Sequence, residues 1–157
     1  MNRTDDDRLQ PEEIVSRYYQ VFYGNGDLKS AKGLMTEESY YMALEPFGIG
    51  LVFRDPAFKM KWDKIKESPD ALQEAEKKIS AELLSRNLSH RIDIKQVEPN
   101  GSERKIVYYE EDGKKKKLYF SKEEGHWLID FYAGCPLPQS YFSSMKKWVI
   151  SKLPSFK

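Results

Sequence analysis

Hydrophobic side chains recur every three or four residues through the first half of the chain, which is the spacing of one buried face of an α-helix. The first such stretch opens at residues 11–13, where Pro-Glu-Glu suits the first turn of a helix, and continues through Ile14, Tyr18 and Val21. Gly24-Asn25-Gly26 ends it. Similar spacing predicts further helices over residues 28–35, 36–44, 56–65 and 69–87.

Capping residues support these boundaries. Side chains that suit a helix N-cap come directly before four of the stretches, at Asp27, Thr36, Asp55 and Ser68. Between the third stretch and the fourth, Pro46, Gly48 and Gly50 are typical chain breakers. We therefore expect an interruption around Phe47 and Ile49.

The pattern changes near residue 90 from helical spacing to the alternation of β-strands. Ile92 and Ile94 alternate with polar residues. Residues 104–111 and 127–132 are rich in β-branched and aromatic side chains, which favour strands. The second half therefore predicts an antiparallel sheet.

One dipeptide fixes the register of this sheet. Asp112-Gly113 is the strongest short hairpin signal, and a two-residue turn there places Glu111 opposite Lys114. A second turn is expected over residues 123–125. The fold class is therefore α+β, with helices before residue 88, an antiparallel sheet of about four strands and a C-terminal helix over residues 140–151.

Strand alternation sorts the side chains of the sheet into two apolar faces. One face is expected to carry Ile106, Tyr108, Tyr119, Trp127, Ile129 and Phe131. The other is expected to carry Val107, Tyr109, Leu118, Phe120, Leu128, Asp130 and Tyr132. We expect the helices to cover the first face. The second then needs the C-terminal helix or a second copy of the chain, and a homodimer through the sheet is the prediction.

Composition and charge narrow the class of protein. Ten Tyr, eight Phe and three Trp, with a net charge of +1, argue against disorder and against a dedicated nucleic-acid binder. The first two lysines of the run at 114–117 lie opposite glutamates across the predicted hairpin, so the run does not form a free basic patch. No apolar run approaches the roughly 20 residues of a membrane span.

The sequence predicts no cofactor and no metal. Cys135 is the only cysteine, and His90 and His126 are the only histidines. The spacing of these residues along the chain matches no known metal-binding motif. The glycines at 48 and 50 lack the Lys-Ser/Thr partner of a phosphate loop. Because residues 1–10 are polar, the chain as given is expected in the cytoplasm; a removed leader would make it periplasmic or membrane-anchored.

Two motifs resemble the nuclear-transport-factor-2-like superfamily, especially its small bacterial domains of unknown function found on lipoproteins or beside transpeptidases. They are Gly-Asn-Gly-Asp at 24–27, followed by Ala31, Leu34, Met35 and Thr-Glu-Glu at 36–38, and Glu-Gly-His-Trp-Leu-Ile-Asp at 124–130. The resemblance implies a cone-shaped domain over residues 11–133, after a leader at 1–10 and before a C-terminal helical extension at 134–157. It also implies frequent dimers through the outer sheet face.

The cone implied by the resemblance would enclose a pocket for a small apolar or amphipathic ligand. The residues expected to line it are Tyr18, Phe22, Tyr41, Trp62, Trp127 and Phe131. The leading hypothesis is a non-catalytic module that binds such a ligand or another protein, because no catalytic constellation stands out. A purely structural domain, its pocket filled by its own aromatic side chains, is a further hypothesis.

The enzymatic alternative is a protein similar to ketosteroid isomerase or a related dehydratase, which abstracts a proton beside a carbonyl. In that alternative, Glu45 before Pro46 is the general base and the Tyr18 hydroxyl stabilises the enolate. A second donor to the enolate could only be Asp130, which the expected register places on the wrong face. The glutamate in place of the family's aspartate is a further departure.

Overall fold

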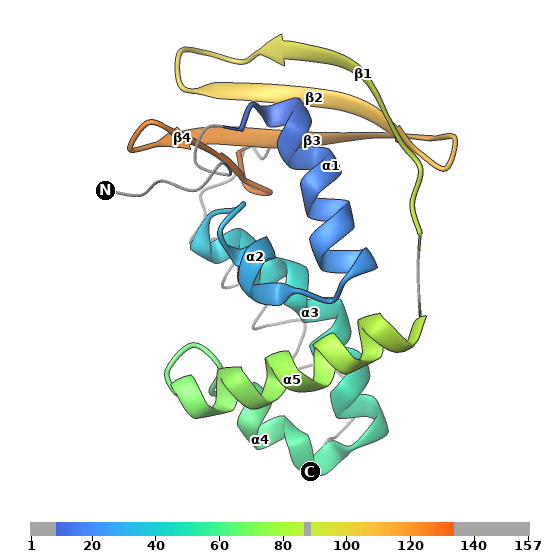
Figure 1. Ribbon diagram of the computed structural model, residues 1–157. Coiled ribbons are helices and arrows are strands. Elements are labelled where there is room, and N and C mark those ends of the chain that lie inside the picture. The colour runs from blue at the N-terminus through green and yellow to red at the C-terminus, as the bar shows by residue number, and fades with distance from the viewer. Residues whose placement is uncertain (1–8, 87–88, 134–157) are drawn as a thin grey trace.

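The computed structural model describes residues 9–86 and 89–133, in which helices precede a four-stranded antiparallel sheet (Figure 1). The predicted α+β class is confirmed. The helix expected over 140–151 and most of the 1–10 leader lie outside the described residues. None of the helices in the described part of the chain combines the length and apolar character needed to cross a membrane.

The helices follow the hydrophobic pattern of the first half. They are α1 (Pro11–Tyr18), the π-helix η2 (Tyr19–Gly24), α2 (Leu28–Lys32), α3 (Glu37–Arg54), the 3₁₀ helix η3 (Pro56–Phe58), α4 (Lys59–Trp62) and α5 (Pro69–Arg86). Three predicted caps are present, since Asp27, Thr36 and Ser68 accept hydrogen bonds from the amides of Ser30, Ser39 and Ala71. Tyr18 is 5% exposed, so its predicted interior position is confirmed.

The predicted break near residue 46 is wrong, because α3 continues through Pro46 to Arg54. The proline removes one helical hydrogen bond, but the helix buries Leu44, Phe47 and Val52 in the core. Gly48 has a packing role instead of a breaking one. A Cβ atom at this position would lie 2.1–2.4 Å from ring atoms of Trp62, so only glycine lets the indole approach this closely.

We predict opposite effects for alanine at the two glycines of α3. Gly48→Ala should lower the free energy of unfolding by about 1–3 kcal/mol, because the new methyl group overlaps the Trp62 ring. At Gly50 the nearest neighbour of an added Cβ is 3.8 Å away, so Gly50→Ala should raise stability by about 0.5–1 kcal/mol. Urea denaturation measures both, and equal effects would contradict the packing argument.

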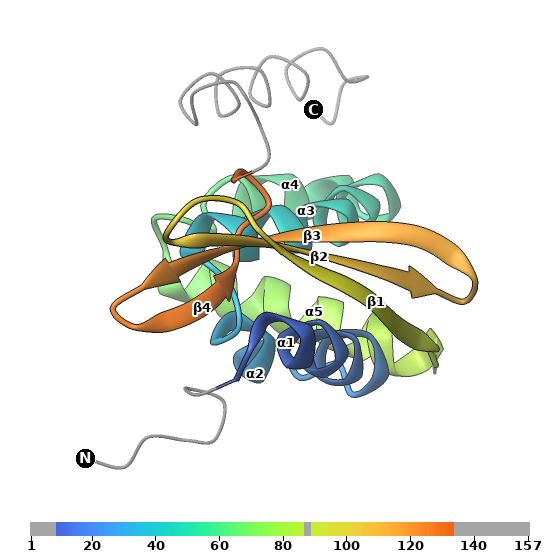
Figure 2. The ribbon, with the colours of Figure 1, turned by 90° about the horizontal axis from the view of Figure 1, so that it is seen from above.

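The sheet is a simple meander of β1 (Ile92–Pro99), β2 (Arg104–Glu111), β3 (Lys114–Glu123) and β4 (His126–Ile129). The predicted register of β2 and β3 is confirmed, with Glu111 opposite Lys114 and Ile106 opposite Tyr119. The helices lie on one side of the sheet, and α1 runs against that side (Figures 1 and 2).

The expected division of β2 and β3 into two faces is confirmed, but the helices cover the face of Val107 and Tyr109 instead of the face of Ile106 and Tyr108. The expected faces of β4 are reversed, because the β3–β4 turn has two residues instead of three. Glu124 and Gly125 both have positive φ, at 50° and 83°, and the turn pairs Phe120 with Ile129. A one-residue change of register reverses every side chain of a strand. The face toward the helices therefore carries the buried side chains Val107, Tyr109, Leu118, Phe120 and Ile129.

Most side chains of the apolar face that was expected to lie bare point toward the helices instead. Among those in regular strands, only Leu128 points away from the helices. The last strand also ends at Ile129 instead of residue 132. The edge of β4 is not left open, since the link between α2 and α3 pairs with it. Ile129 donates its amide to the Leu34 carbonyl (2.9 Å) and accepts from the Thr36 amide (3.0 Å).

The left-handed conformation of Glu124 gives a second prediction. Asn is the residue that type I′ turns favour before Gly, so Glu124→Asn should stabilise the protein by up to about 1 kcal/mol. Glu124→Gln removes the same charge without the preference for positive φ and is the matched control. Thermal unfolding measures both, and an equal gain in the two variants would assign the effect to charge.

Candidate functional site

The six residues expected to line a pocket do not share one cavity. Tyr18 and Phe22 lie together in the core, with ring centroids 5.4 Å apart. Trp62 packs on α3, as described above. The ammonium groups of Lys105 and Lys122 lie 4.8 and 5.5 Å from the centroid of the Trp127 ring. Lys66 lies over the Tyr41 ring, and the Phe131 amide donates to Ser39 Oγ at 3.0 Å.

An open hollow of about 430 Å³ lies instead beside the β3–β4 turn. Trp127 is the one expected pocket residue that lines it. The other lining residues are Gly33, Leu34, Glu123, Glu124, His126 and Leu128. Its walls combine charged turn residues with few apolar ones, unlike the mostly apolar pockets that hold small ligands.

The three residues of the enzymatic alternative divide between two places. Asp130 Oδ2 accepts from Ser121 Oγ at 2.7 Å, and its Oδ1 accepts from the Tyr132 amide at 3.0 Å. Burial raises the pKa of the Tyr132 hydroxyl, and the nearby charges of Glu45 and Asp130 add to this rise. The charges of Glu45 and Asp130 therefore both act on Tyr132. The ring contacts of Tyr18 are with other tyrosines and Phe22.

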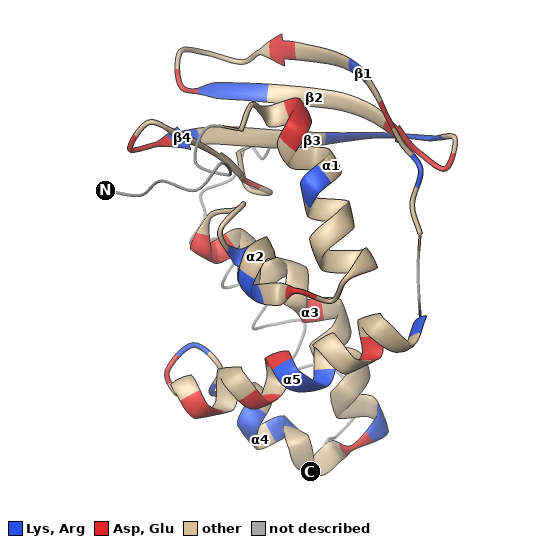
Figure 3. Cartoon of the chain, viewed as in Figure 1, with Lys and Arg blue, Asp and Glu red and all other residues tan. Residues whose placement is uncertain are grey.

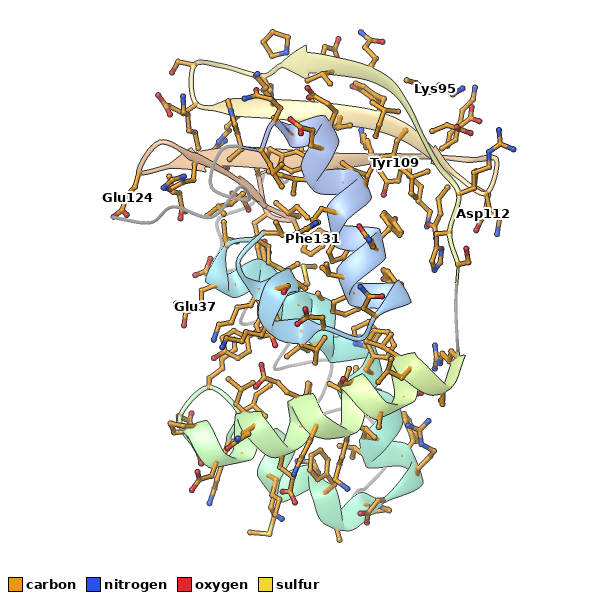
Figure 4. All side chains as sticks on the ribbon, in the orientation of Figure 1. Glu37, Lys95, Tyr109, Asp112, Glu124 and Phe131 are labelled. Carbon is orange, nitrogen blue, oxygen red and sulfur yellow. The ribbon has the colours of Figure 1, made fainter. Side chains whose placement is uncertain are left out.

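A tyrosine cluster lies between η2 and the sheet, formed by Tyr18, Tyr19 and Tyr23 of the helices and Tyr109 of β2 (Figure 4 labels Tyr109). Tyr19 and Tyr23 stack with an interplanar angle of 23°. Tyr18 meets both edge-on, at centroid distances of 5.4 and 5.8 Å. Burial raises the pKa of Tyr18 far above its usual range, so this hydroxyl stays protonated.

Hydroxyl groups of the cluster connect to one acid. The hydroxyls of Tyr19 and Tyr109 are 2.7 Å apart, and Tyr19 donates to Glu111 Oε1 at 3.2 Å. Lys116 donates to the same oxygen. Burial alone would raise the pKa of Glu111, but the hydrogen bond and charge of Lys116, with smaller contributions from His90 and Tyr19, lower it.

Sequence analysis missed Glu111, although a signal was present. Glu111 has the same strand parity as Val107 and Tyr109, so a correct assignment of faces would have placed a carboxylate on the helix side of the sheet. A charged group on that side needs partners. Tyr19, His90 and Lys116 come from distant parts of the chain, and no local pattern joins them.

The lowered pKa of Glu111 predicts a pH dependence. Stabilisation from a carboxylate with a lowered folded-state pKa is complete above its unfolded pKa of about 4.3, and is lost as pH falls through the folded value. Glu111→Gln should cost about 1–2 kcal/mol at neutral pH and reduce the loss of stability below about pH 5. Urea denaturation across pH 3–7 checks this, with Glu110→Gln on the outer face as control. Equal slopes in the wild type and Glu111→Gln would contradict it.

The outer face of the sheet, which points away from the helices, is the second candidate site. Its centre carries four half-buried apolar or aromatic side chains, Ile106, Tyr108, Tyr119 and Leu128. Acidic residues lie along β1 and a run of lysines occupies the first half of β3 (Figure 3). On the outer face, Asp93, Glu98 and Glu110 lie on the side of β1, and Lys115 and Lys117 lie on β3. Arg104 of β2 and Glu123 of β3 lie on the same face, at the other end of the strands from Glu110 and Lys115.

One group within the described ranges places potential metal ligands together. Ligand atoms of His90, Glu111 and Asp112 all lie within 4.8 Å of one another.

Comparisons with protein-family models, curated proteins and solved structures find no match to the chain. The superfamily resemblance therefore stays a prediction, and the function has to be argued from these sites.

Proposed function

We propose that the chain is a non-catalytic interaction module that forms a homodimer through the outer face of its sheet. The observation that carries the proposal is the apolar strip on this face with opposite charges on its two sides. Aromatic and large aliphatic side chains at the centre of a patch, with charges at its rim, are typical of protein interfaces.

The interior favours this proposal over small-ligand binding. The space between η2 and the sheet, where a cone-shaped domain would hold a ligand, contains the tyrosine cluster with its rings in mutual contact. A ligand there would have to displace buried rings and break the hydrogen bond between Tyr19 and Tyr109. A dimer through the sheet also agrees with the superfamily resemblance, which we retain as a proposal.

The order of the strands makes the outer face complementary to itself. A two-fold axis parallel to the strands and above β2 would place β1 of one copy over β3 of the other. Asp93, which pairs with Glu110 on the acidic side, would then approach the partner's Lys115. Ile106 of β2 would lie close to the axis and meet its own copy. Arg104 and Glu110, towards the two ends of β2, would also meet their own copies, and Lys115 would lie beside each Glu110.

Ile106→Asp tests the proposal, because it places two carboxylates near the axis. We expect the dimer dissociation constant, measured by sedimentation velocity, to rise at least about 100-fold, since like charges there cost several kcal/mol. Leu84→Asp is the control: Leu84 is 55% exposed on α5, away from the sheet, and its replacement should leave the dimer intact. A wild-type chain that is monomeric at high micromolar concentration would overturn the proposal.

A charge exchange tests the orientation separately. Lys115→Glu should weaken the dimer, and the added change Asp93→Lys should restore it, because each pair across the interface regains opposite charges. Failure of the double variant to recover would rule out this axis. If deletion of residues 134–157 turned a monomeric wild type into a dimer, that segment would be the native cover of the face.

A further inference from the structure

At the end of the tyrosine cluster, an imidazole and two carboxylates meet. His90 precedes β1, Glu111 ends β2 and Asp112 begins the turn to β3 (Figure 4 labels Asp112 beside this turn). His90 Nδ1 lies against Glu111 Oε2 and 3.7 Å from Asp112 Oδ2. The β1–β2 pairing and the hairpin turn thus bring three potential ligands to one point.

Each carboxylate is held by one oxygen and directs the other toward His90. Glu111 Oε1 accepts hydrogen bonds from Lys116 and Tyr19, whereas Oε2 faces the imidazole. Asp112 Oδ1 accepts from the Arg91 amide at 2.9 Å, whereas Oδ2 faces the imidazole. In metal sites, hydrogen bonds to the carboxylate oxygen that does not face the ion hold the ligand group in its orientation.

His90 is held in place by ring contacts and by the contact of Nδ1 with Glu111. Its side chain is 14% exposed, and its ring contacts those of Tyr19 and Tyr23 at centroid distances of 5.4 and 5.0 Å. Neither ring nitrogen makes a hydrogen bond of acceptable geometry to a described residue, although both are buried. Nδ1 nevertheless faces both carboxylates and is in contact with Glu111 Oε2, so a metal ion bound there would replace that contact by a metal–ligand bond.

We propose that His90 Nδ1, Glu111 Oε2 and Asp112 Oδ2 bind a divalent transition-metal ion such as Zn²⁺. One imidazole nitrogen with two carboxylate oxygens is a ligand set that suits Zn²⁺ better than Mg²⁺ or Ca²⁺. Two ligand atoms about 2.1 Å from a tetrahedral ion lie about 3.4 Å apart, close to the 3.7 Å between Nδ1 and Oδ2. Nδ1 and Glu111 Oε2 are in direct contact, so these two atoms have to move apart to admit the ion. With three protein ligands, the fourth position is left for water or an external group.

The competing account is an ion pair, in which a protonated His90 lies between the two carboxylates and no metal binds. The two accounts differ in what Zn²⁺ does to the folded protein. Isothermal titration calorimetry with ZnCl₂ near neutral pH, on chains carrying Cys135→Ser to remove the thiol, separates them. We expect one ion per chain and a rise in Tm on adding Zn²⁺.

Three variants assign the ligands. His90→Phe keeps the ring contacts with Tyr19 and Tyr23, and it should weaken Zn²⁺ binding at least about 100-fold and abolish the rise in Tm. Asp112→Asn keeps both the turn preference and the acceptor for Arg91, and it should weaken binding about tenfold. His126→Phe changes the other histidine, beside the β3–β4 turn, and should leave binding unchanged.

The proposal fails if the parent chain binds no Zn²⁺, which would leave the ion pair as the role of the cluster. It also fails if His90→Phe binds as tightly as the parent, or if His126→Phe alone removes binding. Circular dichroism of each variant confirms that a loss of binding is not a loss of folding. Because the cluster lies on the helix side of the sheet, these results are independent of dimerisation through the outer face.

Discussion

The two-residue turns at Asp112-Gly113 and Glu124-Gly125 determine which side of β3 and β4 meets the helices. Side chains alternate along a strand, so the length of a turn decides the face of everything that follows it. With the observed turns, Phe120 and Ile129 pair on the buried side. An additional residue in the second turn would bring Leu128 to the core and expose Ile129.

The sequence predicts those features that one local signal controls. Asp-Gly specified the β2–β3 register correctly, because both residues tolerate the positive φ of the turn. Glu124 gave no such signal, since glutamate rarely takes this conformation and the surrounding sheet holds it there. The continuation of α3 through Pro46 likewise goes with the burial of Leu44, Phe47 and Val52, which is a matter of tertiary packing.

The candidate sites were less predictable, because their residues come from separate segments. Tyr18 was identified as interior from its helical spacing, yet its neighbours depend on how η2 meets β2. Glu111 joins a hydroxyl from η2, an ammonium from β3 and an imidazole before β1. The β3–β4 turn decides only which side chains of β4 face outward, whereas no local signal shows which side of β2 and β3 the helices cover.

The pairing of Leu34–Thr36 with Ile129 has a consequence for the order of folding. It joins the end of α2 and the start of α3 to the last strand, two segments far apart in the chain. A ribosome adds about 5–20 residues per second, so the Leu34 carbonyl waits on the order of 5–20 s for its partner to be synthesised. Until β4 emerges, the backbone of Leu34–Thr36 lacks its strand partner and the core lacks the side chains of β4. A nascent chain stalled before residue 129 exposes both features to chaperones.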